Sequence, residues 1–130
     1  MSQSRLLADE NCGRNLIAAC RRLAPGFPAE RIAVLKPGWL GFQDDGLLDA
    51  CRAAGLVLVA HDRRTLAHAA LRAIRDRGGH AGVILYRRIV RQNDYGAQSR
   101  LLVNFWRKAA GWDWSNRIVY LPLTTPSVTL

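Results

Sequence analysis

The stretch Val57-Leu58-Val59-Ala60-His61-Asp62 decides the fold that we expect for this chain. It opens with an uninterrupted apolar run, with Gly55 just before it and charged residues after it. An apolar run between such boundaries is typical of a strand that is buried on both faces of a sheet. Asp62 would then lie where that strand ends.

Acidic residues follow two other apolar segments in a similar way. A predicted strand at 6–8 leads directly into a pair of acids, and the loop after a second predicted strand at 31–35 ends at another pair. If the three strands are parallel neighbours, their carboxyl ends meet at one edge of the sheet. The acids that we expect along this edge are Asp9, Glu10, Asp44, Asp45 and Asp62.

Predicted strands and helices alternate along the whole chain. This alternation, with short connections, is the pattern of an α/β domain in which three layers enclose a mostly parallel five-stranded sheet. We expect one domain over 1–122 and a loose C-terminal tail over 123–130. The remaining strands are predicted at 82–86 and 117–121, and the helices at 11–23, from Gln43 or Asp44 to Gly55, at 65–77, and from Asn93 or Asp94 onward.

Length and composition fit a single domain. The chain has 130 residues, enough to bury a core, and no apolar run approaches the roughly 18 residues of a membrane span. The N-terminal residues lack the apolar stretch of a signal peptide, so we expect a cytoplasmic protein without a membrane contact. Three cysteines without a Cys-x-x-Cys pair favour neither a disulfide framework nor a zinc site.

The charge balance favours a polyanionic partner. Nineteen Lys and Arg against ten Asp and Glu leave a net charge of +9, and nearly all of the positive charge is arginine, which suits bidentate phosphate contact. The alternative is an arginine-rich solvated face without a ligand. The candidates for contacting a nucleic-acid backbone follow the third and fourth predicted strands: Arg64, His68, Arg72, Arg87 and Arg88.

Clustered carboxylates point to a bound cation. Ionised carboxylates repel one another, and hard oxygen ligands select Mg²⁺ or Mn²⁺ over zinc or copper. A divalent metal beside basic residues can catalyse phosphodiester hydrolysis, because it activates water and stabilises charge on the phosphorus oxygens. On this hypothesis Asp9, Asp44 and Asp62 are catalytic and hold the metal. The alternative for each acid is a helix cap or a loop turn.

Several segments resemble the PIN-like nuclease domains of the PilT N-terminus superfamily. More narrowly, they resemble a bacterial branch of short proteins, long described as a domain of unknown function, that is often found beside antitoxin genes. Together the segments cover nearly the whole chain. They are Leu7-Ala8-Asp9-Glu10-Asn11, Asp44-x-x-Leu47-Leu48-x-Ala50, Val57-Leu-Val-Ala-His-Asp-x-Arg-Thr65, Gly82-Val-Ile-Leu85 and Trp114-x-Asn116-Arg117-Ile-x-Tyr-Leu-Pro122.

This resemblance implies a metal-dependent endoribonuclease that acts as the toxin of a toxin–antitoxin pair. Its cofactor would be Mg²⁺ or Mn²⁺, its substrate RNA, and its protein partner an antitoxin. The acidic positions of PIN domains match Asp9, Asp44 and Asp62, and the neighbouring Glu10 and Asp45 are further candidate metal ligands.

Two departures from the PIN-like pattern concern the third acid. Ala60 stands two residues before it, where Thr or Ser is common, and Arg63 and Arg64 stand where many PIN-like proteins have a fourth acid. A depleted acidic set binds metal weakly, so the alternative is that this chain is a slow or inactive relative of the PIN-like nucleases.

Two other kinds of function stay open. One is a non-catalytic module that binds nucleic acid or protein on a degenerate PIN-like scaffold. The other is a receiver-type phosphoacceptor domain, which needs a lysine after a late strand, and the only lysines are Lys36 and Lys108. A loop with Trp39, Leu40 and Phe42 is compatible with association into a homodimer.

Overall fold

The computed structural model describes residues 5–123. Its sheet has five strands in the order β2-β1-β3-β4-β5, and each neighbouring pair is parallel. The prediction of a three-layer α/β fold is confirmed, and the sheet is wholly parallel rather than mostly so. The strands are β1 (Leu6–Ala8), β2 (Ala29–Arg31), β3 (Val57–His61), β4 (Val83–Tyr86) and β5 (Ile118–Leu121).

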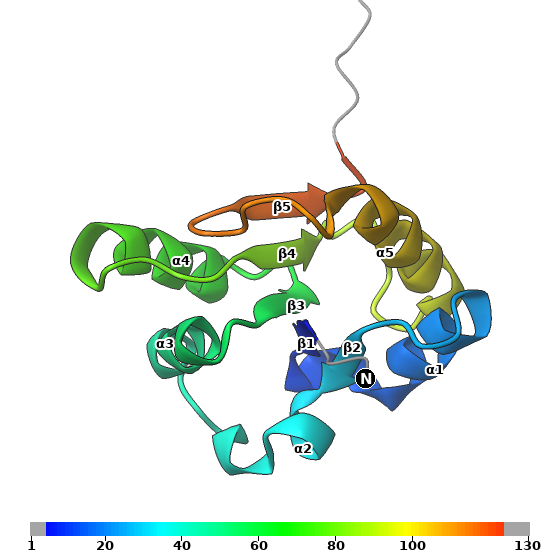
Figure 1. The fold of residues 1–130 in the computed structure, drawn as a ribbon, viewed down its shortest axis with the longest axis horizontal. Helices are drawn as coiled ribbons and strands as arrows, with labels where there is room; N and C mark the ends of the chain where they lie inside the picture. The colour runs from blue at the N-terminus through cyan, green and yellow to red at the C-terminus, as the bar shows by residue number, and fades with distance from the viewer. Residues whose placement is uncertain (1–4, 124–130) are drawn as a thin grey trace, which may run out of the picture.

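Helices cover both faces of this sheet. In Figure 1, α1 and α5 lie on one side of the sheet and α3 and α4 on the other. No helix within residues 5–123 is long and apolar enough to cross a membrane. The predicted tail lies, from residue 124 onward, outside the described residues. The helices are α1 (Gly13–Leu23), α2 (Ile32–Leu35), α3 (Asp44–Ala54), α4 (Arg64–Asp76) and α5 (Tyr95–Ala109), with 3₁₀ turns η1 (Glu10–Cys12) and η2 (Pro37–Trp39).

The central strand β3 joins the two halves of the core. All of its residues are buried. Val57 and Val59 pack into the cluster that α1 and α5 share, whereas Leu58 and Ala60 pack into the cluster below α3 and α4. Successive side chains of a strand point to opposite faces, so an unbroken apolar run is what a strand covered on both sides requires.

The predicted strand at 31–35 is wrong. Strand β2 lies earlier, because the backbone N–H groups of Arg5 and Leu6 both donate to the Pro28 carbonyl and align the following residues with β1. The predicted stretch is mostly the single helical turn α2, closed where the Lys36 N–H donates to the Ile32 carbonyl. Val34 is 53% exposed, so this short apolar run does not fill a buried strand.

The predicted helix boundaries hold to within a few residues. Gly55 ends α3 in the left-handed conformation with φ of 70°. Asp94 caps α5, and its carboxylate accepts a hydrogen bond from the Ala97 N–H at 3.1 Å. Gln43 occupies the N-cap position of α3 but makes no side-chain capping bond. Asp44 lies in the first turn of the helix, and its carboxylate pairs with Arg63.

The buried His80 ties the loop before β4 to the loop before β5. Its ring Nδ1 accepts a hydrogen bond from the Gly82 N–H at 3.0 Å, and its backbone N–H donates to the Asn116 side chain. Burial lowers the pKa of His80 below its usual value. Protonation at Nδ1 would also break the bond from Gly82.

We therefore expect acid to destabilise the fold through His80. The unfolded chain binds the proton near pH 6.5, whereas the folded chain resists it, so stability is lost as the pH falls from about 6.5 toward the lowered pKa. The loss from one such histidine is at most about 1.4 kcal/mol per pH unit. Urea unfolding between pH 7 and pH 5 should show that the unfolding free energy falls less in His80→Asn than in the wild type. An equal fall in the two proteins would contradict this assignment.

Candidate functional site

The carboxyl edge of the sheet contains the point where strand order reverses. The chain passes from β1 to β2 on one side and later returns to β3 on the other side of β1. Sites in open parallel sheets lie at such a point, beyond the carboxyl ends of the strands. Asp9 follows β1 here, and its backbone N–H donates to the Val59 carbonyl of β3 at 2.9 Å.

Arg63 bridges two of the predicted catalytic acids. Its Nη1 donates to Asp9 Oδ2 at 2.5 Å, and its Nη2 donates to Asp44 Oδ1 at 2.6 Å. The side chain of Asp9 is 7% exposed, that of Asp44 20% and that of Arg63 32%. The fold therefore brings Asp9 and Asp44 together, as expected, but around a guanidinium group.

Both oxygens of the Asp9 carboxylate have a donor. Oδ1 accepts the backbone N–H of Glu10 at 2.8 Å, while Oδ2 receives Arg63. A buried carboxylate is costly unless it is paired and hydrogen-bonded. Asp9 meets that condition within the protein alone.

The charge on Arg63 is stabilised where it stands. Burial opposes that charge, but the hydrogen bonds and charges of Asp9 and Asp44 outweigh burial and raise the pKa of the guanidinium above its usual value. The ion pairs are partly shielded from water, so salt weakens them less than it weakens an exposed pair.

Glu10 and Asp45 point to other partners. Glu10 Oε1 accepts the backbone N–H of Gly41 at 2.9 Å and so fastens the loop that leads into α3. Asp45 Oδ1 receives Arg72 Nη2 of α4 at 3.0 Å. Neither carboxylate contributes a bond to the Arg63 bridge.

Asp62 is placed by its backbone rather than by its side chain. Its N–H donates to the Tyr86 carbonyl of β4 at 2.8 Å. The partly exposed Asp62 carboxylate has no ion pair with any residue that the structure describes.

The arrangement does not fit a divalent metal ion. Within residues 5–123 there is no group of three or more His, Cys, Asp or Glu side chains arranged to hold one. The space between Asp9 and Asp44 already contains the positive charge of Arg63. A second cation there would meet repulsion from the first.

The predicted nucleic-acid contacts divide into paired and unpaired residues. Arg72 is held by Asp45, and Arg87 Nε donates to the Pro122 carbonyl while its guanidinium lies over the Tyr120 ring. Arg64, His68 and Arg88 are exposed. A small pocket of about 270 Å³ lies beside the Arg63 bridge and is lined by Gln43, Asp44, Asp45, Thr65, His68 and Arg72.

Cys12 lies buried beside the site. Its Sγ donates to the Val59 carbonyl at 3.5 Å. Burial, reinforced by the charge of Asp9, raises the pKa of the thiol to about 12, which keeps it protonated at neutral pH.

The residue that sequence reasoning missed is Arg63. The sequence marked it only as a departure from an acidic position. A cation directly after the third acid was the available signal, because clustered carboxylates need a positive partner of some kind.

No family model, curated protein or solved structure matches this chain. Its fold and this edge define it as a parallel α/β domain with an arginine-bridged carboxylate pair at the switch point.

Proposed function

We propose that this protein binds RNA along the carboxyl edge of its sheet and, with Arg63 in place, does not cut it. The observation that carries this proposal is the double ion pair of Arg63 with Asp9 and Asp44. It removes the two carboxylates from catalysis and cancels negative charge that would otherwise repel phosphate.

Unpaired arginines at the same edge supply the attraction for phosphate. Arg64 begins α4 directly beyond β3, and Arg88 and Arg91 lie in the segment beyond β4. All three are exposed, and within residues 5–123 none of them forms an ion pair. Exposed arginines are well suited to phosphate oxygens, and a net charge of +9 adds attraction at longer range.

A metal-dependent endoribonuclease of PIN-like type is the second candidate. It is favoured by the nearness of Asp9 and Asp44, which one guanidinium spans, and by the resemblance of the chain to such nucleases. Arg63 is 32% exposed, so it has access to water if it leaves the pair. On this reading the protein is a toxin with an antitoxin partner, and Arg63 holds it inactive.

An RNA-binding and cleavage assay separates these candidates. A labelled single-stranded RNA is mixed with wild type, Asp9→Asn, Arg64→Glu/Arg88→Glu and Arg22→Glu/Arg107→Glu in the presence of Mn²⁺. The control pair makes the same charge change in the last turns of α1 and α5, at the opposite end of the sheet, where both arginines are exposed. Reversing the edge arginines should weaken binding by at least about tenfold more than the control and should flatten the dependence on salt.

The products decide what the protein does with RNA. Intact RNA with wild type supports binding without cleavage. Cleavage that Asp9→Asn abolishes would instead establish the nuclease. Equal binding by the two charge-reversed variants would show that the carboxyl edge is not the contact surface.

A further inference from the structure

A groove of about 530 Å³ lies between α5 and the end of β5. We propose that it binds an acidic, amphipathic peptide segment of a partner protein. The proposal rests on an apolar floor, on two cations at the rim, and on the charge of the surrounding helix.

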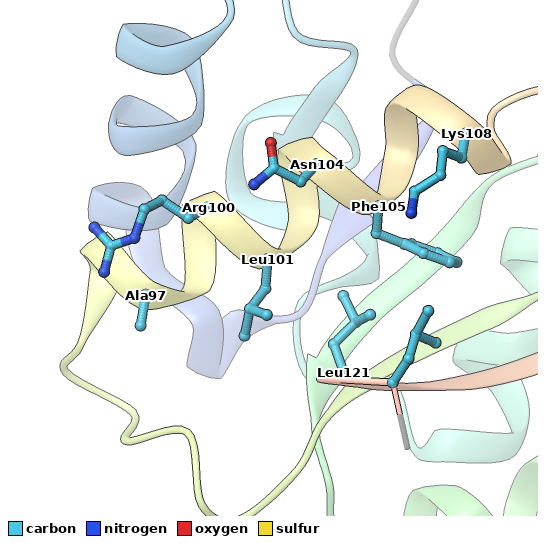
Figure 2. Close-up of a pocket in the computed structure, with 8 residues that line it drawn as sticks. Ala97, Arg100, Leu101, Asn104, Phe105, Lys108 and Leu121 are labelled. Atoms are coloured by element: carbon cyan, nitrogen blue, oxygen red, sulfur yellow. The ribbon is translucent and has the colours of Figure 1, made fainter. Parts of the chain in front are cut away.

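The floor is made of large apolar side chains from both elements. Figure 2 shows Leu101 and Phe105 on the side of α5 that lies toward Leu121. Leu121 and Phe105 are buried and belong to the main core, so they form a firm base. Leu123, which also lines the groove, is 52% exposed. A partner that covers it would remove apolar surface from water.

Two positive side chains stand at the rim. Arg100 and Lys108 line the groove, are exposed, and form no ion pair with the residues described in the structure. They are eight residues apart on α5, which corresponds to about 12 Å along the axis. Residues 95–109 contain no Asp or Glu. The nearest acid on this segment is the N-cap Asp94, which lies close to Arg100 and whose carboxylate accepts the Ala97 N–H, so Lys108 has no acidic neighbour on α5.

The apolar floor and the positive rim together favour an acidic, amphipathic peptide over the other possible occupants of the groove. A second copy of the chain carries +9, so it would set cation against cation. Residues 124–130 contain no acidic side chain to meet Arg100 or Lys108. Nucleic acid would find phosphate contacts but no stacking surface, because Phe105 is 4% exposed and packs edge-on against Trp112 and Trp114. A peptide with apolar residues between carboxylates satisfies both the floor and the rim.

The groove and the arginines assigned to RNA lie at the same end of the sheet but are made of different residues. None of its lining residues belongs to the Arg63 bridge or to the arginines assigned to RNA. Each proposal can therefore fail without the other.

Selection from a random-peptide display library tests the proposal on the full chain. Peptides are enriched on wild type, and one enriched peptide is labelled and titrated into wild type, Arg100→Glu/Lys108→Glu and Arg14→Glu/Arg22→Glu. The control reverses two exposed charges that are also eight residues apart, on α1. Thermal unfolding of each variant verifies that it is folded.

We expect enriched peptides that combine Asp or Glu with Leu, Ile or Phe. Binding should weaken by at least about tenfold in Arg100→Glu/Lys108→Glu and by much less in the control. A peptide with its acids replaced by lysine should recover binding to the reversed variant. The proposal would be overturned if no peptide were enriched or if the enriched peptides lacked acids. It would also be overturned if both variants bound the peptide equally, or if a short RNA displaced the peptide.

Discussion

Replacing Arg63 with methionine is expected to lower the free energy of unfolding by about 3 kcal/mol at pH 7. The substitution keeps an apolar stem but removes the charge that pairs with Asp9 and Asp44. The Asp9 carboxylate, 7% exposed, would then be buried without a positive partner. Urea unfolding of the two proteins measures the difference.

A double-mutant cycle tells whether the pair itself is responsible. Asp9→Asn/Arg63→Met removes the buried negative charge together with its partner, so it should be less destabilised than the two single changes added together. Additive losses would mean that Arg63 acts through packing alone. A fully stable Arg63→Met would mean that the bridge contributes nothing to the fold.

Leu58→Ala is expected to cost about 3 kcal/mol of unfolding free energy. Leu58 has no exposed surface, and it sits in the middle strand of the sheet against the cluster below α3 and α4. Truncation leaves a cavity that rigid neighbours on both sides cannot fill. Chemical denaturation followed by circular dichroism gives the loss.

Leu71→Ala is the matched control for that change. Leu71 lies on α4 and is 58% exposed. The same truncation there should change stability by less than about 0.5 kcal/mol. Equal losses at the two positions would contradict the placement of β3 at the centre of the core.

The fold could be predicted because its strongest signals are local. The apolar run of β3 and the left-handed Gly55 that precedes it leave little choice of structure. The position of β2 could not be predicted, because the hydrogen bonds of Arg5 and Leu6 to Pro28 set it and they join residues distant in sequence. Four apolar residues at 32–35 fit a short strand or a helical turn equally well.

The placement of the acids at the carboxyl edge could be predicted, but their arrangement around a cation could not. Parallel strands place Asp9 and Asp62 beyond the ends of β1 and β3, and α3 begins at Asp44. Which cation meets these carboxylates depends on the reach of one long side chain. The direction of Arg63 follows from packing and charge in three dimensions, which residue spacing does not encode.

Titration with Mn²⁺, followed by the electron paramagnetic resonance signal of the free ion, tests most directly whether Arg63 keeps a divalent cation from binding to Asp9 and Asp44. Wild type, Asp9→Asn, Arg63→Met and Asp9→Asn/Arg63→Met are compared without RNA. Because Arg63 places a positive charge between the two acids, its removal should tighten Mn²⁺ binding by at least about tenfold, and Asp9→Asn should reverse that gain. Wild type that binds Mn²⁺ as tightly as Arg63→Met, with Asp9 required in both, would contradict the account.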